Sequence, residues 1–559
     1  MTGWVVRQFK GVAPRITPRQ LPDNMAQSCA NVNFKHGSLV PRKANTAVLT
    51  LPKSGTIKTV HRFGQDVSSD TQYWFHWATE GVNVVRGPVS GDVQERTYWT
   101  GDGVPKVTDS SIALTGGTQY PMASYTLGIP APEAAPTAVV GGTPESATAL
   151  DETRLYVVVF RSGWHEQGAP SLPSIAVSVK VGETVTLGLP AVPSGAYNIT
   201  TKEIYRSVPG SLGTPYLFVA EVSAATTSYV DSKLADELGE ELPSLDYEMP
   251  PAGLDGLVAL PGGVMAGFVG KDIYFSEPFK PHAWPSKYSL TAKNDIVALG
   301  VFDATLLVLT KGRPELVSGT HPENYSQVDA VLQQACVSAR SVVSADGGVI
   351  FASPDGLFLV GGGVTRNLTE ATHSQEEWRA LQPATLHGYL IDNQYVGFYG
   401  GTAGFVVDLA TGDVCPLDWY AQCGFYDPIR DALFLVTGTN SLVKFDSGSA
   451  LTQSWRSRPF YSPSPVSLGA ARVEASAYPV TFKAHATAKD STDAAAIRAV
   501  RPALSGAGST LTYTATVNDD LPFRLPDGFT AKEWAFEVSS TSEVISAGFA
   551  ETVQELGNG

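Results

Sequence analysis

The side chains that could carry out chemistry in this sequence are its many carboxylates, nine histidines and four cysteines. Glycoside hydrolysis requires two carboxylates that face each other across a cleft. The strings nearest to a hydrolase Asp-box (Ser-x-Asp-x-Gly-x-Thr-Trp) are Ser344–Gly348 and Ser353–Gly356, and both lack the final Thr-Trp. We interpret both strings as hairpin turns.

The other candidate groups do not match known site patterns either. The histidines are scattered, and Cys415 and Cys423 have no histidine near them, so no metal site is indicated. Gly361–Gly363 lacks the lysine of a phosphate-binding loop, and no Gly-x-Ser-x-Gly nucleophile elbow occurs. We therefore predict a protein that is not an enzyme, with no catalytic residues, no metal site and no cofactor. Four cysteines are too few for a disulfide framework, so we expect them to be buried and reduced.

The charge of the sequence is divided unevenly. The first 60 residues hold nine Lys or Arg and one acid, a net charge of +8, whereas the rest hold 30 basic and 53 acidic side chains, a net charge of −23. This asymmetry favours a basic arm that docks on an acidic neighbour, such as the next copy of the chain. The alternative is a solvated basic surface loop. The candidate docking residues are Arg7, Lys10, Arg15, Arg19, Lys35, Arg42 and Lys43.

Short strands dominate the rest of the pattern. Runs such as Val349–Ala352 and Ala432–Val436 are rich in residues that favour strands and end near turn residues. We expect only short helices, and the best candidates lie around Asp23–Cys29 and Ser374–Leu381. Asp23 or Asn24 can cap the first of them. No run reaches the ~18 apolar residues of a membrane span. The N-terminus has no apolar core of a secretory signal, so export by that route is not expected.

The predicted fold class is all-β, a β-propeller-like body with an inserted β-sandwich and a C-terminal β domain. Strand pairs with tight turns recur at spacings of ~40–50 residues, which is typical of propeller blades, although unrelated β-meanders are an alternative. Many short strands behind a Pro/Gly-rich linker, including Thr201–Arg206 and Thr226–Asp231, resemble a fibronectin III or immunoglobulin-like module. The predicted segments are a basic arm (1–56), first blade or blades (57–135), the sandwich (136–250), remaining blades (251–450) and the C-terminal domain (451–559).

Both ends of the sequence carry distinctive motifs. The N-terminal part consists of Phe9–Arg15, Leu21–Asn24 and Gly37–Arg42, and the C-terminal part of Phe523–Gly528 and Trp534–Val538. Placed on either side of a propeller-like middle, these motifs resemble the tail nozzle (tail tubular protein B-like) family of short-tailed bacteriophages. The motifs themselves cover a minor part of the chain.

The resemblance implies a structural protein of the virion tail, assembled in the host cytoplasm. Its copies would form a closed ring, a hexamer, below a tail adaptor ring, with tail fibres or a spike as further partners. Double-stranded DNA would pass through the ring without specific binding, and no insertion into a membrane is implied. A closed ring needs two different complementary faces on each copy, and a basic arm against an acidic body would supply them.

The acidic surplus of the body suggests how DNA would pass without being held. Carboxylates that line a channel repel phosphates, whereas lysines would bind them by counterion release. The candidates for this lining, at expected turns or strand edges of the propeller, are Asp295, Asp303, Asp346 and Asp355. The alternative function is a phage receptor-binding or glycan-cleaving tail protein, but neither a β-helix repeat nor a hydrolase constellation occurs. A bacterial propeller binding protein would leave both terminal motifs unexplained.

Overall fold

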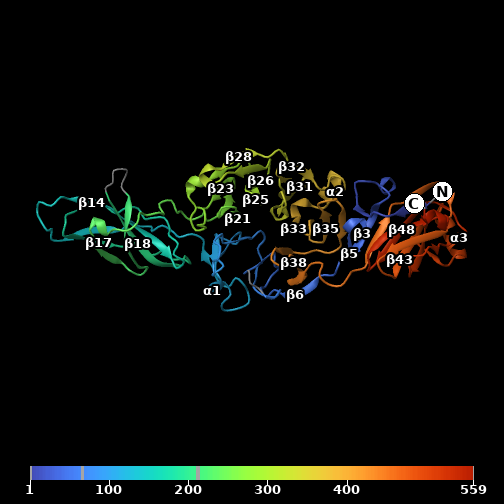
Figure 1. Ribbon diagram of the computed structural model, residues 1–559, viewed down its shortest axis with the longest axis horizontal. Coiled ribbons are helices and arrows are strands. Elements are labelled where there is room, and N and C mark those ends of the chain that lie inside the picture. Colours follow the sequence, from blue (N-terminus) through green and yellow to red (C-terminus); the bar gives the residue numbers. More distant parts are fainter. Residues whose placement is uncertain (1–2, 65–67, 209–214, 558–559) are drawn as a thin grey trace. The chain divides into compact units, whose positions relative to one another are not determined.

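A computed structural model describes residues 3–64, 68–208 and 215–557 of the chain (Figure 1). Strands make up 45% of the described residues and helices 8%, which confirms the all-β prediction. The chain forms two compact units. The first unit comprises residues 1–62, 68–72 and 334–559, and the second comprises residues 63–67 and 73–333.

The second unit contains three antiparallel sheets of four consecutive strands each, the arrangement of propeller blades. Their first strands lie next to one another, and apolar residues such as Trp284 and Leu299 fill the space between neighbouring sheets. The strands are β9 (Asn83–Arg86), β10 (Thr97–Thr100), β11 (Lys106–Thr108) and β12 (Tyr125–Thr126); β21 (Asp255–Leu260), β22 (Val264–Val269), β23 (Asp272–Phe275) and β24 (Leu290–Thr291); and β25 (Ile296–Phe302), β26 (Thr305–Thr310), β27 (Glu315–Ser318) and β28 (Ser326–Asp329). Strand β8 (Trp74–Trp77) precedes them.

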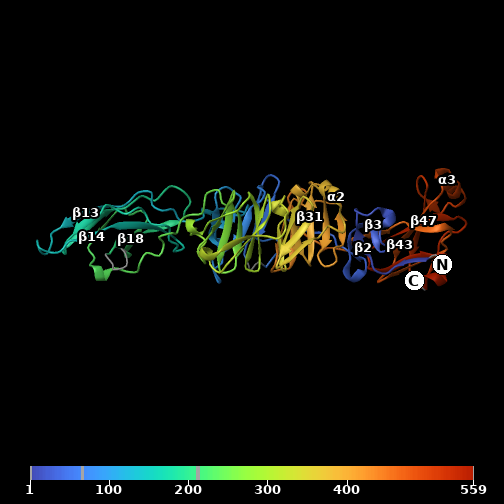
Figure 2. The same cartoon turned by 90° about the horizontal axis from the view of Figure 1, so that it is seen from above.

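A β-sandwich is inserted between the first and second of these sheets. One of its sheets has the order β13-β17-β20 and the other β15-β18-β19, and β14 pairs with β16. Tyr156, Val185 and Ile204, which come from both sheets, meet in its core. Figures 1 and 2 show its strands running along the length of the sandwich. The strands are β13 (Thr137–Gly142), β14 (Glu152–Arg154), β15 (Tyr156–Ser162), β16 (Val177–Val179), β17 (Glu183–Gly188), β18 (Ile199–Ser207), β19 (Tyr216–Ser223) and β20 (Ser228–Asp231).

The first unit holds three further four-stranded sheets of the blade type, besides the sheets that contain the two ends of the chain. The fourth strand of the last sheet is β6 (Thr46–Thr50), which pairs with β39 although nearly 400 residues separate them in sequence. Helix α2 (Gln375–Ala380) follows the first of these sheets, where the sequence predicts a helix, and Ser374 and Glu377 form a capping box at its start. The strands are β29 (Val343–Ala345), β30 (Gly348–Ser353), β31 (Gly356–Gly361) and β32 (Val364–Asn367); β33 (His387–Ile391), β34 (Gln394–Tyr399), β35 (Ala403–Asp408) and β36 (Val414–Leu417); and β37 (Cys423–Asp427), β38 (Ala432–Thr437) and β39 (Ser441–Lys444).

The two ends of the chain fold together into what we call the terminal domain. Strand β1 (Gly3–Val6) pairs with β48 (Val544–Ala550), and β3 (Met25–Ala30) pairs with β40 (Gln453–Ser457) and, in parallel, with β2 (Lys10–Val12). In Figure 1 the labels of the two termini accordingly lie close together. The other elements of the domain are β41 (Phe460–Val466), β42 (Ala470–Ala475), β43 (Val480–Thr487), α3 (Ser491–Val500), β44 (Leu504–Ser505), β45 (Thr510–Val517), β46 (Phe523–Arg524) and β47 (Ala531–Ser540).

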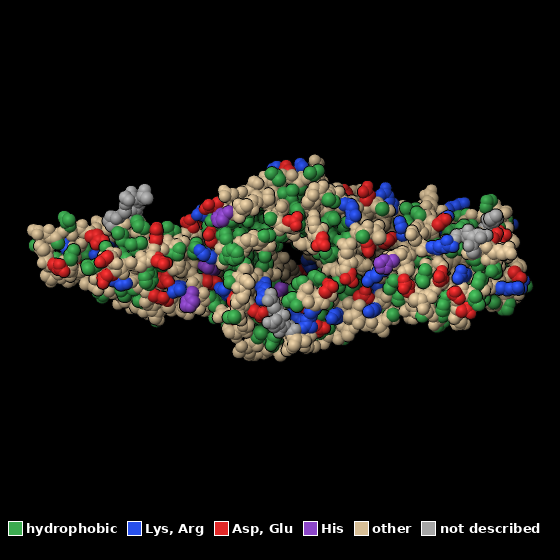
Figure 3. Space-filling view, in the orientation of Figure 1, with side chains coloured by type: hydrophobic (Ala, Val, Ile, Leu, Met, Phe, Trp, Pro, Cys, Tyr) green, Lys and Arg blue, Asp and Glu red, His purple; other side chains and the backbone are tan. Residues whose placement is uncertain are grey.

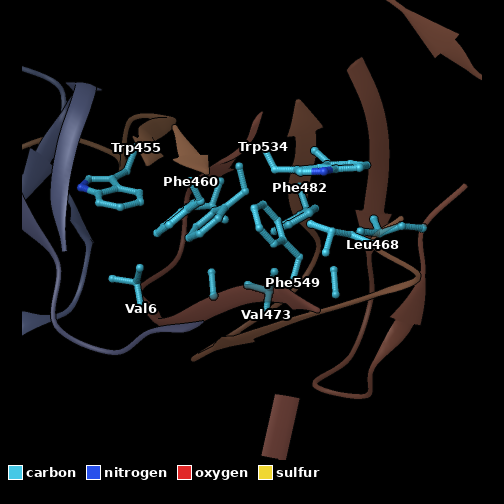
Figure 4. Packing of buried hydrophobic residues seen from close by; sticks show 14 of the residues in the cluster. Val6, Trp455, Phe460, Leu468, Val473, Phe482, Trp534 and Phe549 are labelled. Atoms are coloured by element: carbon cyan, nitrogen blue, oxygen red, sulfur yellow. The ribbon is translucent and has the colours of Figure 1, made fainter. Parts of the chain in front are cut away.

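An aromatic core holds the terminal domain together. Strand β47 alternates apolar and polar residues, so that Trp534 and Phe536 face inward while Glu537 faces outward. Phe536 lies against Phe549 of β48 with ring centroids 5.3 Å apart. Figure 4 shows Val6 of the N-terminal strand in the same cluster as residues that come more than 450 positions later.

Two expectations for the N-terminal segment (residues 3–50) are wrong. Asp23–Cys29 does not form a helix, because Met25–Ala30 is strand β3 between two partner strands, and the Asp23 carboxylate accepts a hydrogen bond from Arg458. The described part of the predicted arm, residues 3–56, is also not a separate segment, because it belongs to the first compact unit. Strands β1, β3 and β6 instead pair with strands of their own chain, which satisfies the backbone groups along those paired edges.

The contact between Phe9 and Trp455 tests this account of the N-terminal segment. Phe9 is 1% exposed, its ring centroid lies 4.9 Å from that of Trp455, and Trp455 Nε1 donates a hydrogen bond to the Lys10 carbonyl. We expect Phe9→Ala to lower the free energy of opening of the terminal domain by about 3–5 kcal/mol, because it leaves a cavity in a packed core. Hydrogen exchange of β40 and β48 measures this, and Arg7→Ala, at an exposed neighbour, is the matched control. Equal protection in the two variants would show that the segment is not part of the core.

Candidate functional site

The N-terminal segment connects the terminal domain to the blades of the first unit. Strand β2 runs so close to β36 that a Cβ atom on Gly11 would lie 2.3 Å from the Val414 carbonyl oxygen. The Gly11 amide donates to Asp413 Oδ1 at 3.0 Å, and Arg15 Nη1 donates to the Glu370 carbonyl at 2.6 Å. Glycine is therefore required at residue 11 for the close approach of the two strands.

The structure separates the seven basic candidate residues into two groups. Six of them have exposed side chains along the N-terminal segment: Arg7, Lys10, Arg15, Arg19, Lys35 and Lys43. The Arg19 guanidinium lies 4.2 Å from the centre of the Tyr461 ring. On the face drawn in Figure 3, basic and acidic side chains are interspersed over the terminal domain, which carries β43 and β48.

Arg42 differs from the other six because it is 4% exposed. Its guanidinium donates to the Val32 carbonyl and to Gln394 Oε1, each at 3.1 Å, and lies 3.7 Å from Asp446 Oδ2. These partners come from the N-terminal segment, from β34 and from the residues after β39. Arg42 therefore holds three parts of the first unit together and cannot act as a docking residue, which corrects that expectation.

The four acidic candidate residues lie beside the ends of two strands. Asp295 and Asp303 lie at opposite ends of β25, and Asp346 and Asp355 lie at opposite ends of β30. The two ends of a strand lie at opposite edges of its sheet, so the two members of each pair lie at opposite edges as well. Asp295 lies 3.2 Å from Lys311 Nζ. Hydrogen bonds from Gln334 and Gln375 lower the pKa of Asp355, and these bonds give it a structural role in its turn.

A buried polar cluster in the second unit was not foreseen from the sequence. The loop after β15 brings Glu166 Oε1 to 2.8 Å from Arg96 Nη1 of the first blade, and Arg96 Nε lies 2.8 Å from Asp92. On the same loop, Trp164 Nε1 donates to Asp109 Oδ2 at 3.0 Å. These contacts fasten the inserted sandwich to the sheet β9–β12. No sequence signal links Glu166 to Arg96 or Trp164 to Asp109, because these residues lie far apart in the chain.

Burial controls the protonation of this cluster. It raises the pKa of Glu166 to about 7, against the opposing effect of the Arg96 guanidinium. Burial also lowers the pKa of His282 to about 3, aided by the charges of Lys280 and Arg96. His282 Nδ1 lies 3.6 Å from Glu166 Oε1, and it has no hydrogen-bond partner among the described residues. The cluster can therefore exchange a proton near neutral pH at Glu166.

The cysteines are all buried and free, as expected. Cys29 and Cys415, which the sequence gives no reason to pair, have sulfur atoms 3.8 Å apart. Within residues 3–64, 68–208 and 215–557, no group of three or more His, Cys, Asp or Glu side chains is placed to hold a metal ion. No helix in the described part of the chain is long and apolar enough to cross a membrane.

Comparisons with known proteins do not identify a family for this chain. No protein-family model matches the chain, and no curated protein matches it. Among solved structures, the computationally designed Ika8 protein is 9% identical (TM-score 0.29, covering 72% of this chain and 99% of that one). Raptor of Chaetomium thermophilum is 10% identical (TM-score 0.30, 73% and 29%). The WD40 repeats of RRP9 are 10% identical (TM-score 0.25, 57% and 99%).

The neighbouring residues Arg42, which is buried, and Lys43, which is exposed, allow a matched test of whether only the buried one stabilises the fold. We expect Arg42→Gln to lower the free energy of unfolding of the first unit by about 3–5 kcal/mol, since it leaves Asp446 and buried acceptors without their cation. Lys43→Gln should change it by less than about 0.5 kcal/mol, as is usual for an exposed side chain. Urea unfolding followed by tryptophan fluorescence measures both. Equal effects of the two substitutions would contradict the structural role of Arg42.

Glu166→Gln tests the protonation of the cluster. A carboxyl group whose pKa is raised on folding stabilises the folded state below its unfolded pKa and loses that contribution as pH rises through about 7. As the pH rises from 5 to 7.5, the natural protein loses this contribution and the Gln variant does not. The free energy of unfolding of the variant should therefore rise relative to that of the natural protein by up to about 3 kcal/mol. Hydrogen exchange of residues 162–168, compared between the two proteins at each pH, measures the gain. The comparison cancels the titration of His282, which occurs in both, and a difference that does not vary with pH would contradict the prediction.

Proposed function

We propose that the chain is a structural component of a bacteriophage tail, where its copies form a ring-shaped nozzle that continues the DNA channel below the tail adaptor. The terminal domain carries this proposal. The two segments that resemble the nozzle family lie at opposite ends of the chain, yet Phe9, Trp534 and Phe549 belong to one hydrophobic core. Because both terminal motifs contribute residues to one core, we interpret them as parts of one functional domain.

The surface of the N-terminal segment supports a ring of identical copies. A closed ring uses two different faces of each copy, one fitting the other. Six exposed basic side chains, Arg7, Lys10, Arg15, Arg19, Lys35 and Lys43, lie on this segment, while residues 61–559 carry a net charge of −23. Opposite charges favour the encounter of such faces and fix their orientation. In this proposal the segment docks through its surface while its strands stay within their own chain.

The net charge also fits a passage for DNA. A protein that holds DNA gains most of its affinity from lysine and arginine at the phosphates, and the acidic body lacks that surplus. A nozzle of such subunits would let DNA slide during ejection and would take part in its retention through the geometry of the ring. The adaptor ring, and fibres or a spike, are the proposed partners in the virion.

Neutralising the six exposed basic residues together tests the proposal. We expect substitution of all six by glutamine to abolish ring formation, alone or on an adaptor ring, because it removes the charge of one interface face. Native mass spectrometry reports the assembly, and far-ultraviolet circular dichroism reports the fold. The matched control neutralises six exposed lysines elsewhere, Lys271, Lys287, Lys293, Lys311, Lys489 and Lys532, and should still assemble. Rings of the first variant would refute the docking role.

A further inference from the structure

The sulfur atoms of Cys29 and Cys415 lie together at the contact between the terminal domain and a blade. Cys29 is on β3, which pairs with β40, and Cys415 is on β36, which pairs with β35. The two sulfurs are 3.8 Å apart, and the Cys29 thiol donates to the Cys415 sulfur. A disulfide bond is ~2.05 Å long, so modest side-chain rotation and a small shift of strands already in contact would bring the sulfurs into bonding range.

We propose that Cys29 and Cys415 form a redox pair that closes to a disulfide when the protein meets a small-molecule disulfide, such as oxidised glutathione, outside a reducing compartment. The bond would join β3 to β36 and so fasten the terminal domain covalently to the blades. This inference goes beyond the proposed nozzle and does not depend on it.

The surroundings of the pair make Cys415 the attacking sulfur. The hydrogen bond from Cys29 and the nearby Arg42 guanidinium lower the pKa of Cys415, which favours its thiolate. The same pairing raises the pKa of Cys29, which keeps its proton until the second step. The other two thiols donate hydrogen bonds to backbone carbonyls and not to sulfur: Cys336 donates to the Ser338 carbonyl, and Cys423 donates to the Ile57 carbonyl.

The reaction balances as a thiol–disulfide exchange in two steps. The Cys415 thiolate attacks one sulfur of the small disulfide, forms a mixed disulfide and releases one small thiol. The Cys29 thiol then loses its proton and attacks the Cys415 sulfur, which releases the second small thiol. Two protein thiols are oxidised, and one small disulfide is reduced to two thiols. Since both protein sulfurs are buried, we expect the exchange to be slower than that of an exposed thiol.

Alkylation of the full-length protein after incubation with oxidised glutathione tests the proposal. The protein is denatured in excess iodoacetamide, and its thiols are counted by mass spectrometry. All four cysteines should be alkylated before oxidation, and only Cys336 and Cys423 afterwards, with one tryptic peptide pair joined through Cys29 and Cys415. The joined pair should disappear on treatment with dithiothreitol.

Two variants serve as controls for this experiment. Cys336→Ser combined with Cys423→Ser should still form the link, whereas Cys415→Ser should not form it. In the oxidised natural protein, the amides of β3 should exchange more slowly than in the reduced protein. Four alkylated cysteines after full equilibration, a glutathione adduct that persists on Cys29 or Cys415, or a link through Cys336 or Cys423 would each overturn the proposal.

Discussion

The pairing of the two chain ends is the constraint on which the first unit depends. Strand β1 adds to β48, and β3 adds to β40, so the terminal domain cannot form until the whole chain between them has been made. Closing so long a loop costs conformational entropy, and burial of an aromatic core around Trp455 and Phe536 offsets it. The same pairing places β2 against β36 and β6 against β39, so that the N-terminal segment also joins the domain to the blades.

Much of the fold was predictable because it is encoded locally. Alternating apolar residues and turn-forming residues specify strands and hairpins, and the Ser374–Glu377 capping box specifies α2. Helix α3 was missed, although Asp490 caps it by accepting hydrogen bonds from the Thr492 and Asp493 amides. Strand β3 was mistaken for a helix because its two partner strands, which decide its conformation, are a tertiary feature that local sequence does not contain.

The candidate sites were less predictable, since they depend on contacts between distant residues. A run of basic residues is typical of an exposed surface, and nothing local distinguishes buried Arg42 from exposed Lys43. The approach of Cys29 to Cys415, and of Glu166 to Arg96, appears only when strands from different parts of the chain are brought together. The four acidic residues expected at turns, Asp295, Asp303, Asp346 and Asp355, do lie at or beside strand ends. Within each pair, however, the two residues flank opposite ends of one strand and so lie at opposite edges of its sheet.

We propose that this protein is a subunit of a closed ring around DNA and that the terminal domain, built from both chain ends, takes part in the ring. The mass and outline of the native assembly of the unmodified full-length chain, imaged by electron microscopy alone and with its adaptor ring, test the claim most directly. The account predicts closed rings of six copies with a continuous central channel. A monomer in both conditions, or a trimer that cleaves polysaccharide, would contradict it.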